Sequence, residues 1–149
     1  MSERIRVNIA RVCYTVVFIS NMYCALAFIF NPDPYVGSYE LSAASGGIAA
    51  IQGMGVVFAM WNVTYPFYIV NPLKQKTLGI VIIVQQIVGL VGELFIKTGL
   101  DKKQSVLEES IMRFVWFDFA GLILLIIGFA IVYKLYTKTD TPSPMWRDR

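Results

Sequence analysis

Four long apolar blocks fill most of this chain of 149 residues, and they limit the folds that it can adopt. The blocks are Ile9–Phe30, Leu41–Tyr65, Leu78–Ile96 and Met112–Tyr133. Each is long enough to cross hydrocarbon about 30 Å thick, because about 20 helical residues span that distance. Backbone groups in lipid must be satisfied within the segment. Unbroken apolar runs therefore predict helices and not the alternating strands of a barrel.

The composition and the short connectors predict one membrane domain with no soluble domain attached. Only 15% of the residues are charged, compared with roughly 25% in soluble domains. We therefore expect an all-α membrane protein, with an antiparallel bundle of four transmembrane helices in residues 1–136 and a polar tail in residues 137–149. A cleaved signal peptide is an alternative for the first block, because Arg4, Arg6 and Arg11 lie before it or near its start and it contains Ala25-Leu26-Ala27. The block is long for a signal, however, and Asn21 interrupts it.

The distribution of basic residues predicts the orientation. Nine lie at the amino end, in the second connector and in the tail: Arg4, Arg6, Arg11, Lys74, Lys76, Lys134, Lys138, Arg147 and Arg149. Four lie in the first and third connectors or beside them: Lys97, Lys102, Lys103 and Arg113. Because basic residues are retained on the cytoplasmic side, both termini are expected there, in a multi-pass protein of a bacterial-type inner membrane.

Several classes of chemistry lack support in the sequence. There is no histidine, and Cys13 and Cys24 are about 16 Å apart along one helix, too far to form a disulfide with each other. No metal-binding set, nucleotide-binding loop or nucleophile–base pair is present, so we predict no catalytic residue and no metal ligand, and an enzyme is not favoured. The net charge of +3 follows from residues that flank the spans, so the expected partner is the lipid bilayer and not nucleic acid.

Amide side chains lie near the middle of three predicted helices. They are Asn21 in the first, Gln52 in the second, and Gln85 and Gln86 in the third. Amides in lipid need hydrogen-bonding partners, so these residues are expected to face the bundle interior and to bond across helix interfaces. A polar lining for a buried ligand or water is the functional alternative.

Two carboxylates lie farther along the predicted helices, below the outer boundary. Glu93 precedes Lys97 by four residues, and Asp118 follows Arg113 by five. Each could reach its basic neighbour or the membrane surface, which is a structural role. A carboxylate within the membrane is also a candidate functional residue, because burying its charge without a partner is costly. With the amides, these acids complete six candidates for ligand binding or for lining the bundle.

Glycines at three- and four-residue spacing accompany the polar residues. Gly89 and Gly92 lie beside Gln85 on the third predicted helix, and Gly55 lies in the second. Small residues at this spacing allow helix backbones to approach closely, which predicts a tightly packed bundle. Room for a ligand is the alternative role for Gly89 and Gly92.

The segment NPDPYVGSYELSAASGGIAAIQGMGVVFAMW, residues 31–61, and the four-span plan resemble the DoxX-like group of small bacterial membrane proteins. The resemblance lies in the short first outer connector and in the glycine-rich second helix. Some members of that group are linked to quinone-dependent sulfur oxidation, so the resemblance implies a lipid-soluble ligand such as a quinone. The pattern carries no catalytic signature, and no functional residue is transferred from it.

Three functions remain open at this stage. The first is an accessory or structural membrane protein, with a membrane protein partner or a second copy of the chain. The second is a redox-linked bundle that binds a quinone or lipid. The third, less favoured, is proton or ion translocation through Glu93 and Asp118, which would require an oligomer because four helices leave little room for a pore.

Overall fold

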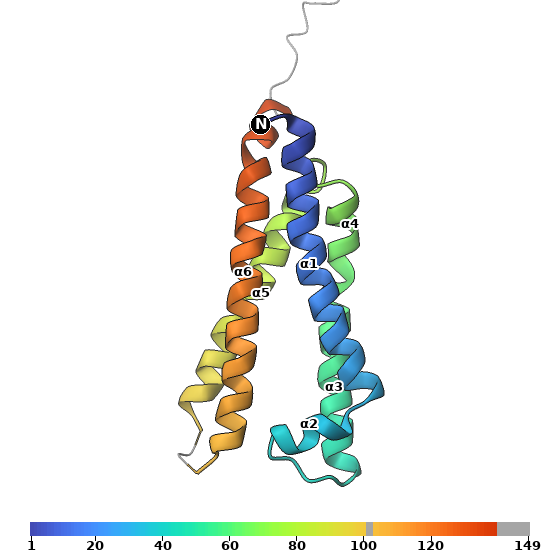
Figure 1. Cartoon of the computed structure of the whole chain (residues 1–149), viewed down its shortest axis with the longest axis vertical. Coiled ribbons are helices and arrows are strands. Elements are labelled where there is room, and N and C mark those ends of the chain that lie inside the picture. The colour runs from blue at the N-terminus through green and yellow to red at the C-terminus, as the bar shows by residue number, and fades with distance from the viewer. Residues whose placement is uncertain (101–102, 140–149) are drawn as a thin grey trace, which may run out of the picture.

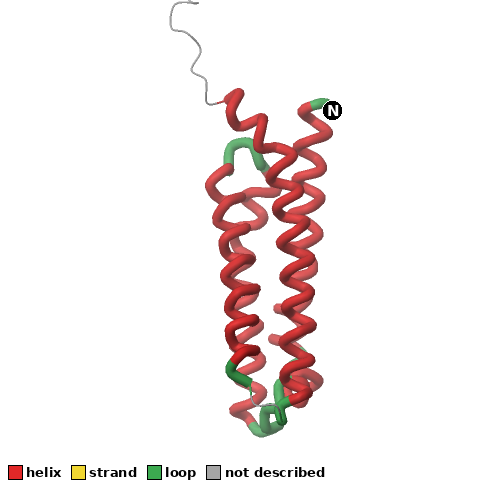
Figure 2. The backbone as a smooth tube through the Cα atoms, turned by 90° about the vertical axis from the view of Figure 1, so that its left-hand side faces the viewer, coloured by secondary structure: helices red, strands yellow, loops and turns green. Residues whose placement is uncertain are grey.

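The described residues of the computed structural model, 1–100 and 103–139, contain helices and no strand (Figure 2). The elements are α1 (Glu3–Phe30), α2 (Asp33–Ser38), α3 (Ser45–Trp61), the 3-10 turn η1 (Asn62–Thr64), α4 (Tyr65–Val70), α5 (Lys76–Thr98) and α6 (Ser105–Thr139). Four helical stretches are long and apolar enough to cross a membrane: Glu3–Phe30, Ser45–Val70, Lys76–Thr98 and Ser105–Tyr136. The chain is therefore a multi-pass membrane protein, as its apolar blocks predicted.

Three of the spans begin before their predicted blocks, whereas the second begins later than predicted: α3 starts at Ser45, and residues 41–44 are not helical. α1 begins at Glu3 and not at Ile9. Ser2 caps this helix start, because its hydroxyl accepts a hydrogen bond from the Ile5 amide at 3.4 Å. α6 begins at Ser105 and includes Thr139, so the first residues of the predicted tail are helical. The rest of that tail, residues 140–149, lies outside the described residues.

The second span differs most from its prediction. We expected a connector from Pro66, but helix continues to Val70 after a single 3-10 turn. Pro66 occupies the first turn of α4, where proline is tolerated because the N–H that it lacks would have no helical partner. The guanidinium of Arg11 bonds the last carbonyl groups of α4, donating to Ile69 O at 3.1 Å and to Val70 O at 2.8 Å.

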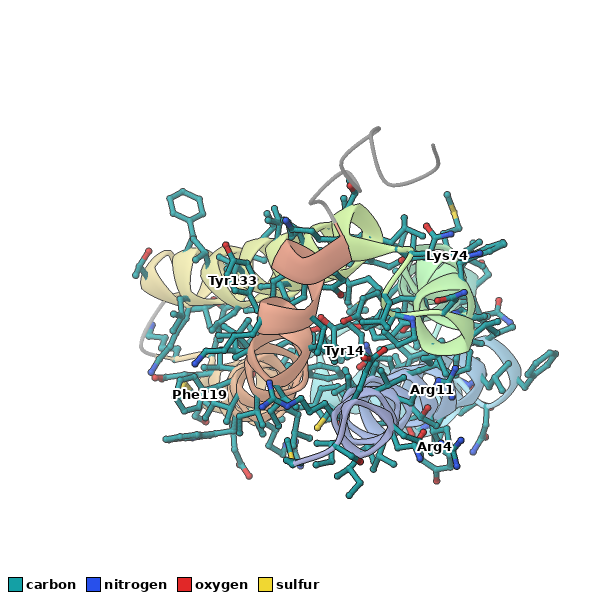
Figure 3. All side chains as sticks on the ribbon, turned by 90° about the horizontal axis from the view of Figure 1, so that it is seen from above. Arg4, Arg11, Tyr14, Lys74, Phe119 and Tyr133 are labelled. Carbon is teal, nitrogen blue, oxygen red and sulfur yellow. The ribbon has the colours of Figure 1, made fainter. Side chains whose placement is uncertain are left out.

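α1 and α6 form the centre of the packing. α1 contacts α3, α4 and α6, while α6 also packs along α5. The start of α1 and the end of α6 lie at one end of the molecule, and α2 lies at the other (Figure 1). Seen along the long axis, Tyr14 points into the middle of the bundle, whereas Phe119 lies on the outside (Figure 3).

Glycines permit the close helix contacts that their spacing predicted. A Cβ atom added at Gly55 on α3 would lie 2.8 Å from the Ala25 carbonyl oxygen on α1. One added at Gly128 on α6 would lie 2.9 Å from Cβ of Cys13. Both distances are too short for a side chain, so α1 approaches α3 and α6 at these glycines.

Candidate functional site

A small polar cavity lies where all four spans meet. Its volume is about 20 Å³, which is enough for one water molecule. Its lining comes from α1, the second span, α5 and α6: Asn21, Phe58, Trp61, Asn62, Tyr65, Gln85, Gln86, Gly89 and Asp118. The structure thus brings four of the six predicted residues, Asn21, Gln85, Gln86 and Asp118, to one place.

Gln86 and Asp118 form the strongest link across this cavity. The Gln86 Nε2 donates to Asp118 Oδ1 at 2.9 Å and to the Asp118 carbonyl oxygen at 3.3 Å. Both residues are buried, with 7% and 6% of their surface exposed. Such a bond to a buried carboxylate is stronger than one between neutral groups. It joins α5 to α6 at the level of the cavity.

Two glycines make room for this pair. A Cβ atom added at Gly89 would lie 2.9 Å from Asp118 Oδ2 and 3.4 Å from the Trp61 ring. One added at Gly121 would lie 3.2 Å from Gln86 Nε2. At Gly92, by contrast, an added Cβ atom would meet nothing within 4 Å. Gly89 and Gly92 were both considered as making room for a ligand, but of these two only Gly89 lines the polar cavity. Because Gly89 has no side chain, the Asp118 carboxylate can lie against α5 at this position.

Asn62 belongs to the polar cavity although it was not among the predicted residues. The Asn21 Nδ2 donates to Asn62 Oδ1 at 3.2 Å, and Asn62 Nδ2 donates to the Phe58 carbonyl oxygen at 2.7 Å. Only 2% of the Asn62 surface is exposed. The sequence could have indicated Asn62 as a buried amide, because it lies within the second apolar block. It was not chosen because that block was predicted to end at Tyr65, which placed Asn62 near the end of the span. The span continues to Val70, so Asn62 lies farther from its end.

The Gln85 side chain supplies an unused hydrogen-bond acceptor to the polar cavity. Its Oε1 is buried and has no hydrogen-bond partner. A water of the size that the cavity accepts could donate to this oxygen. The polar cavity can therefore order water among amides and one carboxylate.

Gln52 is placed differently from its prediction. Its side chain is exposed, and its Nε2 donates to the Ile29 carbonyl oxygen of α1 at 3.0 Å. The residue therefore does not line the bundle interior. α3 is turned so that Ile51 and Gly55 contact α1, which leaves Gln52 on the outer side.

A larger apolar cavity lies between α3 and the α5–α6 pair, beside Tyr39, which directly follows α2. Its volume is about 300 Å³, and Tyr39, Met54, Phe58, Glu93, Ile96, Leu107, Ile111 and Phe114 line it. An engineered apolar cavity of about 150 Å³ is enough to bind benzene. Phe58 lines both cavities, so they are neighbours.

Glu93 is the only charged residue lining the apolar cavity in the described part of the chain. Its Oε2 is buried and has no hydrogen-bond partner. The alternative of pairing with Lys97 is not what the structure shows, because Lys97 Nζ lies 3.5 Å from Glu108 Oε1. Arg113 likewise bonds the Ser110 hydroxyl at 3.0 Å, while Asp118 bonds Gln86. Neither expected acid–base pair forms among the residues described.

The first connector closes one side of the apolar cavity. Tyr39 lines it, and the Tyr39 ring lies 6.2 Å from that of Phe28 and 6.3 Å from that of Phe114, between centroids. Burial raises the pKa of the Tyr39 hydroxyl above its ordinary value. The next residue, Glu40, has a positive φ of 52°, and its Oε1 accepts from the amides of Val106 and Leu107 at 3.2 and 3.3 Å.

The Glu40 carboxylate caps the start of α6. The spacing of Ser105 and Glu108 is itself typical of a capping box at a helix start. The Glu40 carboxylate comes from a distant connector. The Ser110 hydroxyl also donates to the Ser38 carbonyl oxygen at 2.6 Å. Sequence spacing cannot reveal such long-range caps.

The opposite half of the bundle is filled by tyrosine side chains. The Tyr14 hydroxyl donates to the Gly79 carbonyl oxygen at 3.2 Å, and the Tyr14 and Tyr68 rings lie 4.1 Å apart. The Tyr68 and Tyr136 hydroxyls are 3.3 Å apart, and Tyr136 donates to the Pro72 carbonyl oxygen at 2.9 Å. These contacts make a packed core beyond the polar cavity.

Comparisons with protein-family models, with curated proteins and with solved structures find no match for this chain. The DoxX-like resemblance therefore stays a prediction. Within the described residues, no group of three His, Cys, Asp or Glu side chains is placed to hold a metal ion. The two cavities are the features on which a function can be argued.

Proposed function

We propose that this protein crosses a bacterial-type inner membrane four times, with antiparallel spans and cytoplasmic termini, and binds a lipid-soluble ligand in the apolar cavity. The orientation is supported by the basic residues at the amino end, in the second connector and in the tail. It is also supported by the common end at which α1 begins and α6 finishes (Figure 1). The apolar cavity then belongs to the outer half of the membrane.

One observation carries the binding proposal: a cavity of about 300 Å³ combines apolar walls with a single buried acceptor that lacks a partner, Glu93 Oε2. Small-molecule sites are mostly apolar with a few placed polar groups that orient the ligand. The cavity is open at Ile96, which is more than half exposed, so a molecule from the membrane can enter it. A bound ligand would fill the cavity and could donate a hydrogen bond to Glu93 Oε2.

The ligand classes that fit this reading are a quinone and a membrane lipid. Either would place its apolar part against Ile111 and Phe114 and a polar group near Glu93. A quinone would connect the protein to redox chemistry carried out by a membrane protein partner. A lipid would favour an accessory or structural role in such a complex.

Extraction of the purified protein tests this proposal. After gentle solubilisation, organic extraction and mass spectrometry should recover a hydrophobic molecule in stoichiometric amount. Leu107→Trp fills the apolar cavity and should reduce recovery at least tenfold. Val106→Trp is the matched control, because Val106 is exposed on the adjacent position of α6 and should leave recovery unchanged. Recovery that is the same for both variants would refute the assignment of the ligand to this cavity.

Proton translocation is the second candidate, supported by the placement of the two acids. Gly89 adjoins Asp118 Oδ2, and Glu93 follows Gly89 by one helical turn on α5. The Asp118 and Glu93 carboxylates therefore lie about one helical turn apart along the α5–α6 interface. Proton flux into proteoliposomes that disappears with Glu93→Gln would establish this function. Equal flux for the parent protein and the variant would exclude a role for Glu93 in it.

A further inference from the structure

We propose that the apolar cavity selects a lipophilic organic cation, with its ammonium group between the Glu93 carboxylate and the rings of Tyr39, Phe58 and Phe114. The inference rests on the proposed function, because it names the chemical class of ligand for the same cavity. It goes beyond that function in requiring a positive charge. Of the two ligand classes named above, a lipid with an ammonium headgroup meets this requirement, whereas a quinone or an uncharged lipid does not.

The Glu93 carboxyl group has no basic partner among the described residues. Its Oε2 is buried without a hydrogen-bond partner. The basic side chains expected to be nearest are engaged elsewhere, since Lys97 pairs with Glu108 and Arg113 bonds Ser110. A carboxylate buried without a counter-charge is strongly unfavourable in a protein interior or a membrane. A cationic ligand would supply that counter-charge from the membrane phase.

Three aromatic rings form part of the cavity wall. Phe58 and Phe114 stack with centroids 6.0 Å apart, and Tyr39 lies 6.3 Å from Phe114. All three rings line the cavity that holds Glu93. Aromatic faces attract cations through the ring quadrupole, and quaternary ammonium groups are bound by clusters of such rings. A neutral headgroup gains none of this attraction.

The rest of the cavity can hold the alkyl chain of an amphiphile. Ile96, Leu107 and Ile111 supply aliphatic surface beside the rings. Ile96 is more than half exposed, so it forms the rim of the cavity on the outer surface of α5. An alkyl chain can leave past Ile96 into lipid while its headgroup remains at Glu93. The site therefore suits a small ammonium group with an apolar chain.

Two probes with the same chain separate charge from hydrophobicity. Dodecyltrimethylammonium and dodecanol are titrated into the full-length protein in dodecyl maltoside micelles, which contain no ammonium group, with empty micelles as the blank, and binding is followed by calorimetry. We expect the parent protein to bind the cation at least tenfold more tightly than the alcohol. Glu93→Gln should bring the two affinities within about twofold and leave dodecanol binding unchanged.

Glu109→Gln is the control for net charge, because Glu109 is exposed in the first turns of α6 and its loss removes the same charge. The preference for the cation should persist in that variant. Phe58→Leu tests the rings and should lower cation affinity more than alcohol affinity. It also provides the decisive measurement if Glu93→Gln does not fold.

The outcomes distinguish this inference from the proposed function. Equal affinities for the two probes in the parent protein, or a cation preference that survives Glu93→Gln, would overturn the cation site. The binding proposal would then still stand if Leu107→Trp abolished dodecanol binding and Val106→Trp did not. Failure of both probes to bind the parent protein, with no effect of Leu107→Trp on ligand recovery, would overturn both.

Discussion

Asp118 illustrates how a single buried charge depends on its neighbours. Its carboxylate accepts a hydrogen bond from Gln86, and the missing side chains of Gly89 and Gly121 leave room for that contact. Gln86 lies at a depth similar to that expected for Gln52, yet only Gln86 is buried. The two glutamines are chemically identical, so their comparison isolates the effect of environment.

We expect Gln86→Leu to lower the free energy of unfolding by about 1–3 kcal/mol, because it leaves the Asp118 carboxylate without this donor. Gln52→Leu should cost less, since Gln52 is exposed and bonds one backbone carbonyl at the end of α1. Reversible denaturation in mixed micelles would measure both variants. A larger loss for Gln52→Leu would contradict the burial of Gln86 against Asp118.

The glycines of α5 provide a second comparison. Gly89→Ala should destabilise the protein by about 1–3 kcal/mol, because the new methyl group would displace Asp118 or the Trp61 ring. Gly92→Ala should leave stability unchanged or raise it slightly, because space is open there and alanine favours helix. Thermal unfolding followed by Trp fluorescence would separate them. Equal effects would show that Gly89 does not mark a close contact.

At the scale of elements, two helix ends are completed by side chains from far along the chain. Glu40 accepts from the first amides of α6, and Arg11 donates to the last carbonyls of α4. Both charges match the helix dipole, since anions favour an amino end and cations a carboxyl end. These contacts tie the first connector to α6 and the first span to the second.

Removal of the α6 cap is expected to loosen the end of the molecule near the apolar cavity. Glu40→Ala should lower the free energy of unfolding by about 1 kcal/mol, the usual effect of deleting a helix cap. Hydrogen exchange should rise at Val106 and Leu107, whose amides lose their acceptor. Glu109→Ala is the control, and it should leave exchange at those amides unchanged. Unaltered protection in Glu40→Ala would refute the cap.

At the scale of the whole molecule, the helices run between two ends with different charge. The connector between α4 and α5 lies at the end where α1 begins, and α2 lies at the other (Figure 1). The excess of basic residues at the first end predicts that it faces the cytoplasm. The apolar cavity, bordered by Tyr39, would then lie nearer the external surface.

Cysteine labelling in intact cells tests this orientation. In a background with Cys13→Ser and Cys24→Ser, Lys74→Cys should be protected from a membrane-impermeant maleimide. Ala43→Cys, in the connector beyond α2, should react. Both positions are exposed, so permeabilised cells should label both and provide the control. The reverse pattern would show that the termini are external and would place the apolar cavity in the cytoplasmic half.

The apolar blocks alone predicted four spans, because hydrophobic length governs membrane crossing without reference to neighbouring helices. The two acids and three of the amides that were named from their depth in those blocks line one of the two cavities. Rotation about each helix axis was not predictable in this way. It depends on which helices adjoin, and for that reason Gln52 lies outside while Asn62 lies inside.

The remaining features arise from contacts between segments that are distant in sequence. Helix past Pro66, the Glu40 cap on α6 and the division into a polar and an apolar cavity each require a particular neighbour. Local composition determines only the free energy of moving a segment into lipid. That free energy is nearly the same for many rotations of a helix about its axis and for many choices of neighbouring helix. Packing at Gly55, Gly89 and Gly128 selects one of them, because close approach is possible only where a side chain is absent.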